Sequence, residues 1–342
     1  DYAEALYIAG QLFPALEINR SLLQRQDLPG NLVTMIEGRQ ALWQSQTRNF
    51  VFTAELDGGY DNNLNGAPTA SVFTLTLSGE PVSLSLSPEN QAVSGPYANV
   101  RLAGSYQQLT PTKAHDLLFA LRSRNSNNSE SDLLQLDWRY VLSLPERGHR
   151  WSFTGGASHL MFGGSALYTV TEARAAYRTG NDNCKPLYGL AAQHQLYHGQ
   201  SFMSGIEVSA TGGIECQMQG GRQLLSMEGG LISNTALKST RPGGGRLGWK
   251  LQFNWLQQLG KGIIGTQFSY TRLLDEKGYS PLLEFGAKRA VDSQFYRFQY
   301  SRNLLADLTF LVNLSHQNQS SNVGLFENNG TVAELGLQLR LR

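Results

Sequence analysis

The sequence predicts an all-β fold, a transmembrane antiparallel β-barrel that follows a short α-helical segment. Three observations predict it: apolar and polar residues alternate with a period of two after residue 49, the alternating stretches run for about 9–13 residues, and charged residues are scarce. Only 16% of the 342 residues are charged, whereas ordinary soluble domains carry about 25%. Strands with one apolar and one polar face account for all three observations.

The alternation is clearest in residues 134–142. One face of this stretch consists of leucines, Trp138 and a tyrosine, and the other carries a glutamine, Asp137 and Arg139. The pattern recurs at 249–255, 296–300, 308–315 and 335–341. A water-soluble β-sandwich also alternates, with its apolar faces turned inward. The length and number of the stretches, and the charges repeated on the polar face, favour the barrel.

The number of strands depends on residues 72–88. If they form one long strand the barrel has sixteen strands, and if the chain turns at 79–81 there are seventeen. Because bacterial single-chain barrels have even strand numbers, we expect sixteen, with fourteen as the alternative. The candidate strands are 51–60, 72–88, 97–108, 113–123, 131–144, 149–160, 166–178, 185–197, 202–216, 223–233, 246–258, 262–273, 280–289, 292–302, 305–316 and 331–341.

Residues 1–48 follow a different pattern, so we expect two units: a helical segment over 1–48 and the barrel over 49–342. Apolar residues fall at helical spacing before and after Pro29 and Gly30, which interrupt the pattern. This predicts a pair of helices. One pair does not identify a solenoid, since such arrays stack several units, but it fits the last unit of one.

Charge and hydropathy restrict partners and location. The formal net charge is +1, so no basic face for nucleic acid is expected. No apolar run approaches the roughly 20 residues that a spanning helix needs, but a closed barrel crosses a membrane without such a run. An outer-membrane protein needs a signal peptide, and none stands at residue 1, so we expect a mature or trimmed chain.

The two cysteines, Cys184 and Cys216, are expected to form a disulfide. The midpoint between them falls within 198–201, which reads as a hairpin turn, so counting back along both arms places the thiols opposite each other. Such a bridge would suit an oxidising periplasm or cell surface. The alternative is two unpaired thiols, because a register slip of one residue would separate them.

No catalytic residue, metal or cofactor is predicted, and we expect a protein that is not an enzyme. The six histidines form no His-Glu-x-x-His motif, two cysteines alone cannot bind zinc, and no Gly-x-Ser-x-Gly elbow occurs. A triad assembled across strands stays open, because triads are set by geometry. His194 is interpreted as a polar strand residue.

A short string follows the helical segment, with Gly59, Tyr60, Asp61, Asn63 and Asn65 spaced as Gly-Tyr-Asp-x-Asn-hydrophobic-Asn. This string resembles the first barrel strand of outer-membrane proteins in which tetratricopeptide repeats precede a β-barrel, in particular the surface lipoprotein assembly modulator (Slam) family. A second string begins at Ser321 and Asn322 and leads to the last strand. It is similar to the Ser-Asn-hydrophobic loop and closing strand of the same family.

The resemblance implies a location and partners. It implies a barrel in the outer membrane of a Gram-negative bacterium, with the helical segment in the periplasm as the end of a tetratricopeptide-like region. The partners implied are outer-membrane lipids, the barrel assembly machinery and an exported protein or lipoprotein.

The charges on the polar strand faces are expected to line the lumen. In one interpretation they are paired charges of a solvated interior, and in the other they form a polar conduit that guides an exported chain without holding it. Their signs are mixed, so no selectivity for a strongly anionic substrate is expected. The candidates are Asp137, Arg139, Glu172, Arg174, Lys250, Arg297, Glu334 and Arg340.

Three functions remain open from the sequence. The first is a translocation channel that exports a surface-destined protein or lipoprotein, a cargo implied by the Slam resemblance. The second is an exopolysaccharide export porin, which aromatic rows inside the lumen would favour. The third is an outer-membrane lipid-modifying enzyme, which requires a serine or histidine near the outer leaflet, facing lipid, with an acidic or amide partner on a neighbouring strand.

Overall fold

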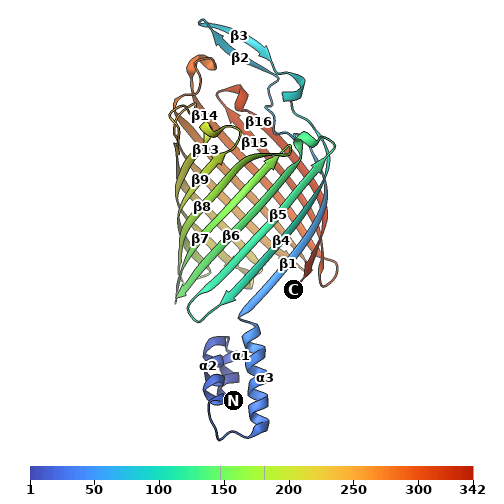
Figure 1. Cartoon of the computed structure of the whole chain (residues 1–342), viewed down its shortest axis with the longest axis vertical. Helices are drawn as coiled ribbons and strands as arrows, with labels where there is room; N and C mark the ends of the chain where they lie inside the picture. The colour runs from blue at the N-terminus through green and yellow to red at the C-terminus, as the bar shows by residue number, and fades with distance from the viewer. Residues whose placement is uncertain (147, 181, 342) are drawn as a thin grey trace.

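A closed barrel of fourteen antiparallel strands stands above three helices in the computed structural model (Figure 1). The structure describes residues 1–146, 148–180 and 182–341, without the side chain of Glu89. The predicted fold class, a transmembrane-type antiparallel barrel with an N-terminal helical segment, is confirmed.

The helical segment contains α1 (Tyr2–Ile8), α2 (Leu12–Leu23) and α3 (Gly30–Ser45). The sequence predicted two helices, and the difference arises at Gly10, whose φ of 76° ends α1 and separates it from α2. The helices pack on a small core around Trp43, on which Tyr7 stacks at 4.6 Å between ring centroids. None of the described helices is both long and apolar enough to cross a membrane.

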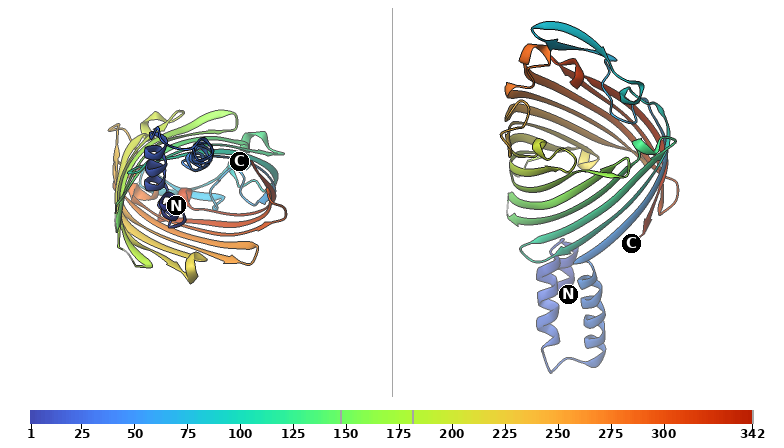
Figure 2. Two further views of the ribbon diagram at one scale, coloured as in Figure 1. Left: turned by 90° about the horizontal axis from the view of Figure 1, so that it is seen from below. Right: turned by 45° about the horizontal axis from the view of Figure 1, so that its top comes forward.

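The barrel strands run up and down in chain order, and the last one pairs with the first. β16 pairs with β1 from Phe52 opposite Leu341 to Asp61 opposite Val332, which closes the ring seen from below in Figure 2. The barrel strands are β1 (Arg48–Asp61), β4 (Gly95–Leu109), β5 (Ala114–Ser126), β6 (Leu133–Glu146), β7 (His149–Phe162), β8 (Ser165–Thr179), β9 (Cys184–Tyr197), β10 (Gly205–Met218), β11 (Gln223–Ala236), β12 (Arg246–Leu259), β13 (Gly262–Gly278), β14 (Lys288–Asn303), β15 (Leu308–Ser321) and β16 (Asn328–Leu341).

The expected number of sixteen barrel strands is wrong, and the alternative of fourteen is confirmed. Residues 72–88 do not cross the barrel: they form a separate hairpin of β2 (Val72–Leu77) and β3 (Glu80–Ser85). Ser78 and Gly79 connect the two strands with φ of 52° and 86°, as a tight two-residue hairpin turn requires. Residues 280–289 are mostly a loop, and only its end belongs to β14.

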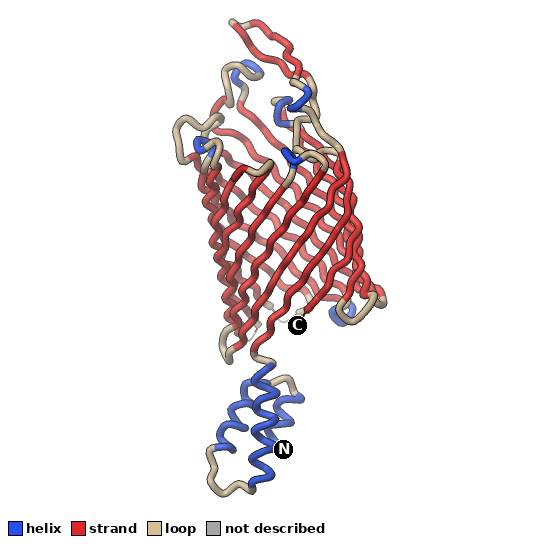
Figure 3. Tube along the Cα trace, turned by 45° about the vertical axis from the view of Figure 1, so that its right-hand side comes forward, coloured by secondary structure: helices blue, strands red, loops and turns tan. Residues whose placement is uncertain are grey.

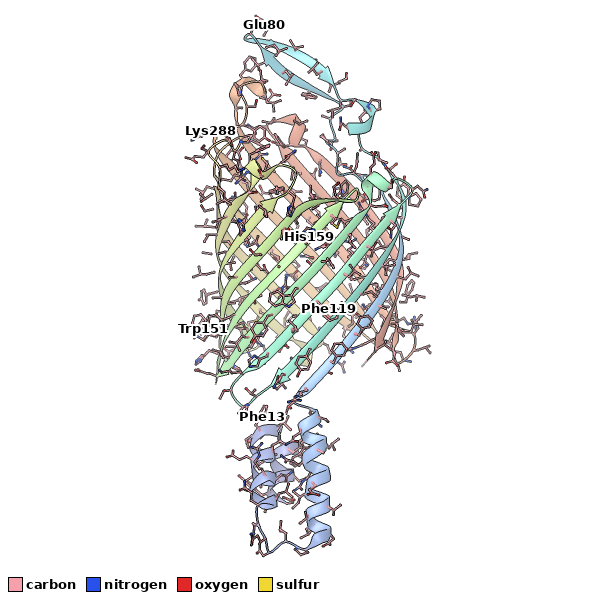
Figure 4. The ribbon with its side chains drawn as sticks, viewed as in Figure 1. Phe13, Glu80, Phe119, Trp151, His159 and Lys288 are labelled. Atoms are coloured by element: carbon pink, nitrogen blue, oxygen red, sulfur yellow. A yellow bond between two sulfur atoms is a disulfide. The ribbon has the colours of Figure 1, made fainter. Side chains whose placement is uncertain are left out.

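The outer surface of the barrel is apolar. Alternate side chains of each strand point outward, and Trp138, Leu335 and Leu337 are between 46% and 59% exposed. Outward aromatic rings of neighbouring strands contact each other, as Trp151 and Tyr177 do at 4.7 Å between centroids. Figure 4 labels Trp151 on this outer wall. Leaving so many large apolar side chains uncovered is the pattern of a surface that faces lipid.

The two ends of the barrel differ. At the end that carries the helices, which we call the helix end, strands are joined by short turns such as 110–113 and 304–307. At the opposite loop end, longer connections such as 62–94 and 279–287 rise above the rim (Figure 3). The β2–β3 hairpin belongs to the first of these and lies at the top of the molecule (Figure 1).

Candidate functional site

The inside of the barrel is the candidate site, because the strand alternation turns polar side chains into the lumen. We call the lumen side of β14–β16, β1, β4 and β5 the closure wall, and that of β6–β11 the far wall. The register places all eight lumen candidates on the inner side, spread around the barrel without meeting at one point. Asp137, Arg139, Glu172 and Arg174 lie on the far wall, Arg297, Glu334 and Arg340 on the closure wall, and Lys250 on β12.

The far wall carries ion pairs that remain in contact with solvent. Asp137, Arg139 and Glu172 border a cavity of 750 Å³. Arg139 Nε lies 3.4 Å from Glu172 Oε1, with 58% and 26% of the two side chains exposed. Gln135 donates a hydrogen bond to Asp137 at 3.0 Å. Ion pairs that are this exposed contribute little stability, so the far wall is a wet polar surface.

Arg174 on β8 reaches across the far wall to β11. Its guanidinium donates to both carboxylate oxygens of Glu228, at 3.1 and 3.3 Å. The side chain passes over Gly189 on β9, where a Cβ would lie 3.3 Å from Arg174 Nη2 and 2.7 Å from Thr211 Oγ1. A glycine at this lumen position therefore leaves the arginine room to lie along the wall.

The closure wall differs because its carboxylates are buried. Glu55, Asp57, Asp61 and Glu334 are each at most 9% exposed, and each accepts a hydrogen bond from a side chain on another strand, as buried charges require. The donors are Arg101 to Glu55 at 3.0 Å, Asn99 to Asp57 at 2.9 Å, Arg124 to Asp61 at 3.1 Å and Tyr97 to Glu334 at 2.7 Å. The first two bonds join β1 to the adjacent β4, whereas the other two span an intervening strand, from β5 to β1 across β4 and from β4 to β16 across β1.

Three predicted cations have no carboxylate within ion-pair distance among the described residues. Lys250 donates to Ser209 Oγ at 3.4 Å. Arg297 lies over the ring of Phe295, 5.1 Å from its centroid. Arg340 stands opposite Thr53 in the β1–β16 register.

Several residues of the closure wall are not among the lumen candidates predicted from the sequence. Asp57 lies in the lumen, where its carboxylate accepts a hydrogen bond from the Asn99 amide. Glu55, Arg101 and Arg122 were not singled out. The period-two signal that identified Asp137 also holds for Glu55 and Asp57, which flank Leu56, so strict alternation along the first strand would have found them.

At the loop end a cluster of arginines folds over the rim. Asp275 is 5% exposed and accepts from Arg289 at 3.1 and 3.2 Å, and Arg246 Nε lies 3.3 Å from the same carboxylate. Arg241, in the loop 237–245, donates to an asparagine on β11. Burial lowers the pKa of Arg241, and the nearby charge of Arg289 acts in the same direction.

The first family-like string fixes the loop that carries the hairpin. Asp61 accepts from the backbone of Asn63 at 2.8 Å, and the Asn63 amide donates to the carbonyls of residues 67 and 329. Asn65 donates to the carbonyl of residue 91 and accepts from the backbone of residue 93. A Cβ at Gly59 would lie 2.7 Å from the ring of Tyr97, which explains the glycine. Tyr60 points outward and is 52% exposed.

The second string holds the start of β14. Ser321 Oγ donates to the carbonyl of Ala290 at 2.8 Å. The Asn322 side chain accepts from the backbone N–H of Ala290 at 2.7 Å and donates to the carbonyl of Lys288 at 2.9 Å. Both strings therefore build the loop-end rim.

Cys184 and Cys216 are joined by a disulfide between β9 and β10. The two residues are direct partners in the register, with Cα atoms 3.9 Å apart. The bridge lies at the helix end on the outward side of the wall, so it does not enter the lumen.

The histidines of the barrel strands point outward, away from the lumen. Thr169 Oγ1 lies 2.8 Å from both His159 Nδ1 and His198 Nε2. His194 also points outward, opposite Ile206, and His316 lies 2.9 Å from a threonine hydroxyl. Among the described residues no histidine is bonded to both a serine and an acidic side chain, and no three metal-ligating side chains converge.

No protein-family model matches the chain. No curated protein matches it either.

Solved structures with similar folds are barrels of the outer membrane. An anion-selective porin from Comamonas acidovorans matches with a TM-score of 0.44 and 8% identity, over 86% of this chain and 99% of that one. OprB of Pseudomonas putida matches with a TM-score of 0.43 and 10% identity, over 89% and 97%. OmpT, an outer-membrane protein of Vibrio cholerae, matches with a TM-score of 0.45 and 7% identity, over 87% and 98%. What passes through this chain is therefore inferred from its own lumen.

Proposed function

We propose that this protein is an outer-membrane channel of a Gram-negative bacterium that exports a surface-destined protein or lipoprotein from the periplasm. The observation that carries the proposal is the lumen itself: both walls carry paired charges and amides and border cavities of 750 and 270 Å³. An interior filled by apolar side chains would make a packed core, whereas a polar interior suits an aqueous path. Export of a polypeptide, and its lipid anchor, is supported by the resemblance of the two strings to the Slam family.

The orientation follows from the connections. Barrels of this kind have short periplasmic turns and longer extracellular loops. The helix end would then face the periplasm, where the helical segment meets the exported chain, and the loop end with the β2–β3 hairpin would face outward. Lipids of the outer membrane would cover the apolar outer wall, and the barrel assembly machinery would insert it.

The charge pairs explain how a chain could pass without being held. Arg139 and Arg174 each have a carboxylate within 3.4 Å, so a passing charge must compete with an existing partner. The lumen then offers a passing chain many weak contacts in place of one strong contact. Conduction requires such weak contacts, because the solute must be able to leave each site. We infer no catalytic role and no cofactor for this transport.

The proposal is tested by single-channel conductance of the purified chain in planar bilayers. Steady conductance is expected, and Ala120→Trp should lower it, because residue 120 lies on the lumen side of β5 and borders the 750 Å³ cavity. Leu121→Trp places the same ring on the lipid side and should leave conductance unchanged. A folded barrel that never conducts, in wild type or variants, would contradict an open channel.

A second candidate is export of a polysaccharide. Tyr168 and Tyr197 stack at 5.8 Å between ring centroids, and Tyr168 borders the far-wall cavity. Aromatic faces are favourable partners for sugar rings in a wet lumen. Block of the conductance by soluble oligosaccharides, lost in Tyr168→Ala, would favour this candidate over a polypeptide cargo.

A further inference from the structure

Exposure separates the two signs of charge inside the lumen. In the ion pairs that line it, the guanidinium is usually the more exposed partner and the carboxylate lies deeper in the wall. The exposed side-chain fractions are 38% and 5% for Arg101 and Glu55, 31% and 10% for Arg122 and Glu334, 58% and 26% for Arg139 and Glu172, and 40% and 20% for Arg174 and Glu228.

The cause is side-chain length. A carboxylate on a short stem stays near the backbone, while arginine carries its charge to the end of a long chain and is easily kept at a water boundary. At these four pairs the charge that lies nearest the open lumen is therefore positive. The mixed signs in the sequence did not indicate this.

The positive surface is most concentrated in a cavity of 270 Å³ on the closure wall. Arg101, Arg122 and Arg297 border it, and Arg297 has no carboxylate within ion-pair distance among the described residues. Beside Arg297, the Gln299 amide donates to the Asn313 side chain at 3.0 Å, so amide groups line the same space.

The carboxylates of this cavity are already occupied. Glu334 accepts from Tyr97 at 2.7 Å and lies 3.6 Å from Arg122. Asp61 accepts from the Asn63 backbone and from Arg124. Both carboxylates therefore already have partners, and among the residues that the structure describes neither lies within ion-pair distance of Arg297.

We propose that this cavity binds oxyanions, with Arg297 as the principal contact and Arg101 and Arg122 adding positive charge. The ligand class is a phosphate, sulfate or carboxylate group, which a guanidinium can bind through two parallel hydrogen bonds. The inference rests on the proposed function in one respect: the groups bound in use are those of the solute or chain that passes through the lumen. The lumen then prefers anions over cations.

The first test is the zero-current potential of the purified chain in planar bilayers across a KCl gradient. The wild type should be anion-selective, and Arg297→Gln should reduce the chloride-to-potassium permeability ratio by about threefold. Lys288→Gln removes the same charge from the same strand at the outer rim, where Figure 4 labels it, and should leave the ratio unchanged. Arg297→Lys should retain most of the selectivity. A cation-selective pore, or an unchanged ratio in Arg297→Gln, would overturn the proposal.

The second test needs no conduction. A ligand that binds only the folded state raises the unfolding temperature, by an amount that grows with the ratio of its concentration to its dissociation constant. Replacing chloride by inorganic phosphate at constant ionic strength should raise the temperature of the heat-dependent gel shift for wild type and Lys288→Gln, but not for Arg297→Gln. If the barrel does not conduct but shows this pattern, the site stands and the channel fails. Equal shifts in all three proteins would reject the site.

Discussion

The two walls of the lumen are built from the same strand alternation but are stabilised differently. On the closure wall the carboxylates are almost fully buried and bonded between strands, as Asp61 is to Arg124. On the far wall the Arg139–Glu172 and Arg174–Glu228 pairs are more exposed, and strands β9 and β10 are joined covalently through Cys184 and Cys216. The difference indicates that the closure wall, where the first and last strands meet, depends on buried polar networks, while the far wall uses its charges mainly to face water.

The largest expected effect comes from breaking the buried network. Asp61→Ala leaves Arg124, only 11% exposed, without its partner and should lower the free energy of unfolding by about 3 kcal/mol. Glu172→Ala removes a carboxylate from the far wall and should cost less than about 1 kcal/mol. Urea unfolding of the detergent-solubilised barrel, followed by tryptophan fluorescence, measures both. Equal losses in the two variants would show that the walls do not differ.

The disulfide provides the next largest effect. Its cysteines are 32 residues apart, and opening a loop of that size by the double change Cys184→Ser and Cys216→Ser should cost about 3 kcal/mol or less. Hydrogen exchange should then increase at the helix end of β9 and β10 and stay unchanged in β1 and β16. If hydrogen exchange increased evenly around the barrel, the disulfide would not stabilise the far wall locally.

A smaller effect is expected at the β2–β3 hairpin, which lies in the connection between β1 and β4. Thr76 bonds the loop before β14 twice: its backbone N–H donates to the carbonyl of Leu282 at 2.8 Å, and its hydroxyl accepts from the backbone of Phe285 at 3.1 Å. Thr76→Val removes the second bond, at a cost of about 1 kcal/mol. Limited proteolysis of the hairpin should accelerate, whereas Thr74→Val, on the same strand, should leave the rate unchanged.

The smallest effect lies outside the barrel, between Arg25 and Asp27. The Arg25 guanidinium lowers the pKa of Asp27 through a hydrogen bond at 2.7 Å, but both side chains are more than half exposed. A lowered carboxylate pKa stabilises the fold at neutral pH, and the contribution disappears as the pH falls through the folded-state pKa. Because water screens this pair, Asp27→Asn should not change the acid titration of helical circular dichroism, and a shifted midpoint in this variant would contradict the expectation.

The strand errors have a common physical origin. Residues 72–88 and 280–289 contain apolar residues at strand spacing, so the local pattern alone does not distinguish them from barrel strands. In the structure both stretches belong to the loop end. There β2 forms backbone contacts with residues 282–285 and is not part of the barrel. Removing these two from the sixteen candidate ranges leaves the fourteen strands of the barrel.

The sequence predicted which side chains face the lumen, but it did not predict which of them contact one another. Alternation placed Asp137, Arg139 and Arg297 on the inner side, since a strand has only two faces. It did not reveal that Asp57 is buried beneath Asn99, because that contact joins residues 42 positions apart on different strands.

By itself the sequence determined the barrel, the inward and outward faces and the helical segment, because these follow from periodicity and composition, which are local properties. Only the tertiary structure decided the strand number, the burial of the closure-wall carboxylates and the exposure of their arginines. Those depend on the register between strands, and register is a relation between distant residues that no local pattern contains.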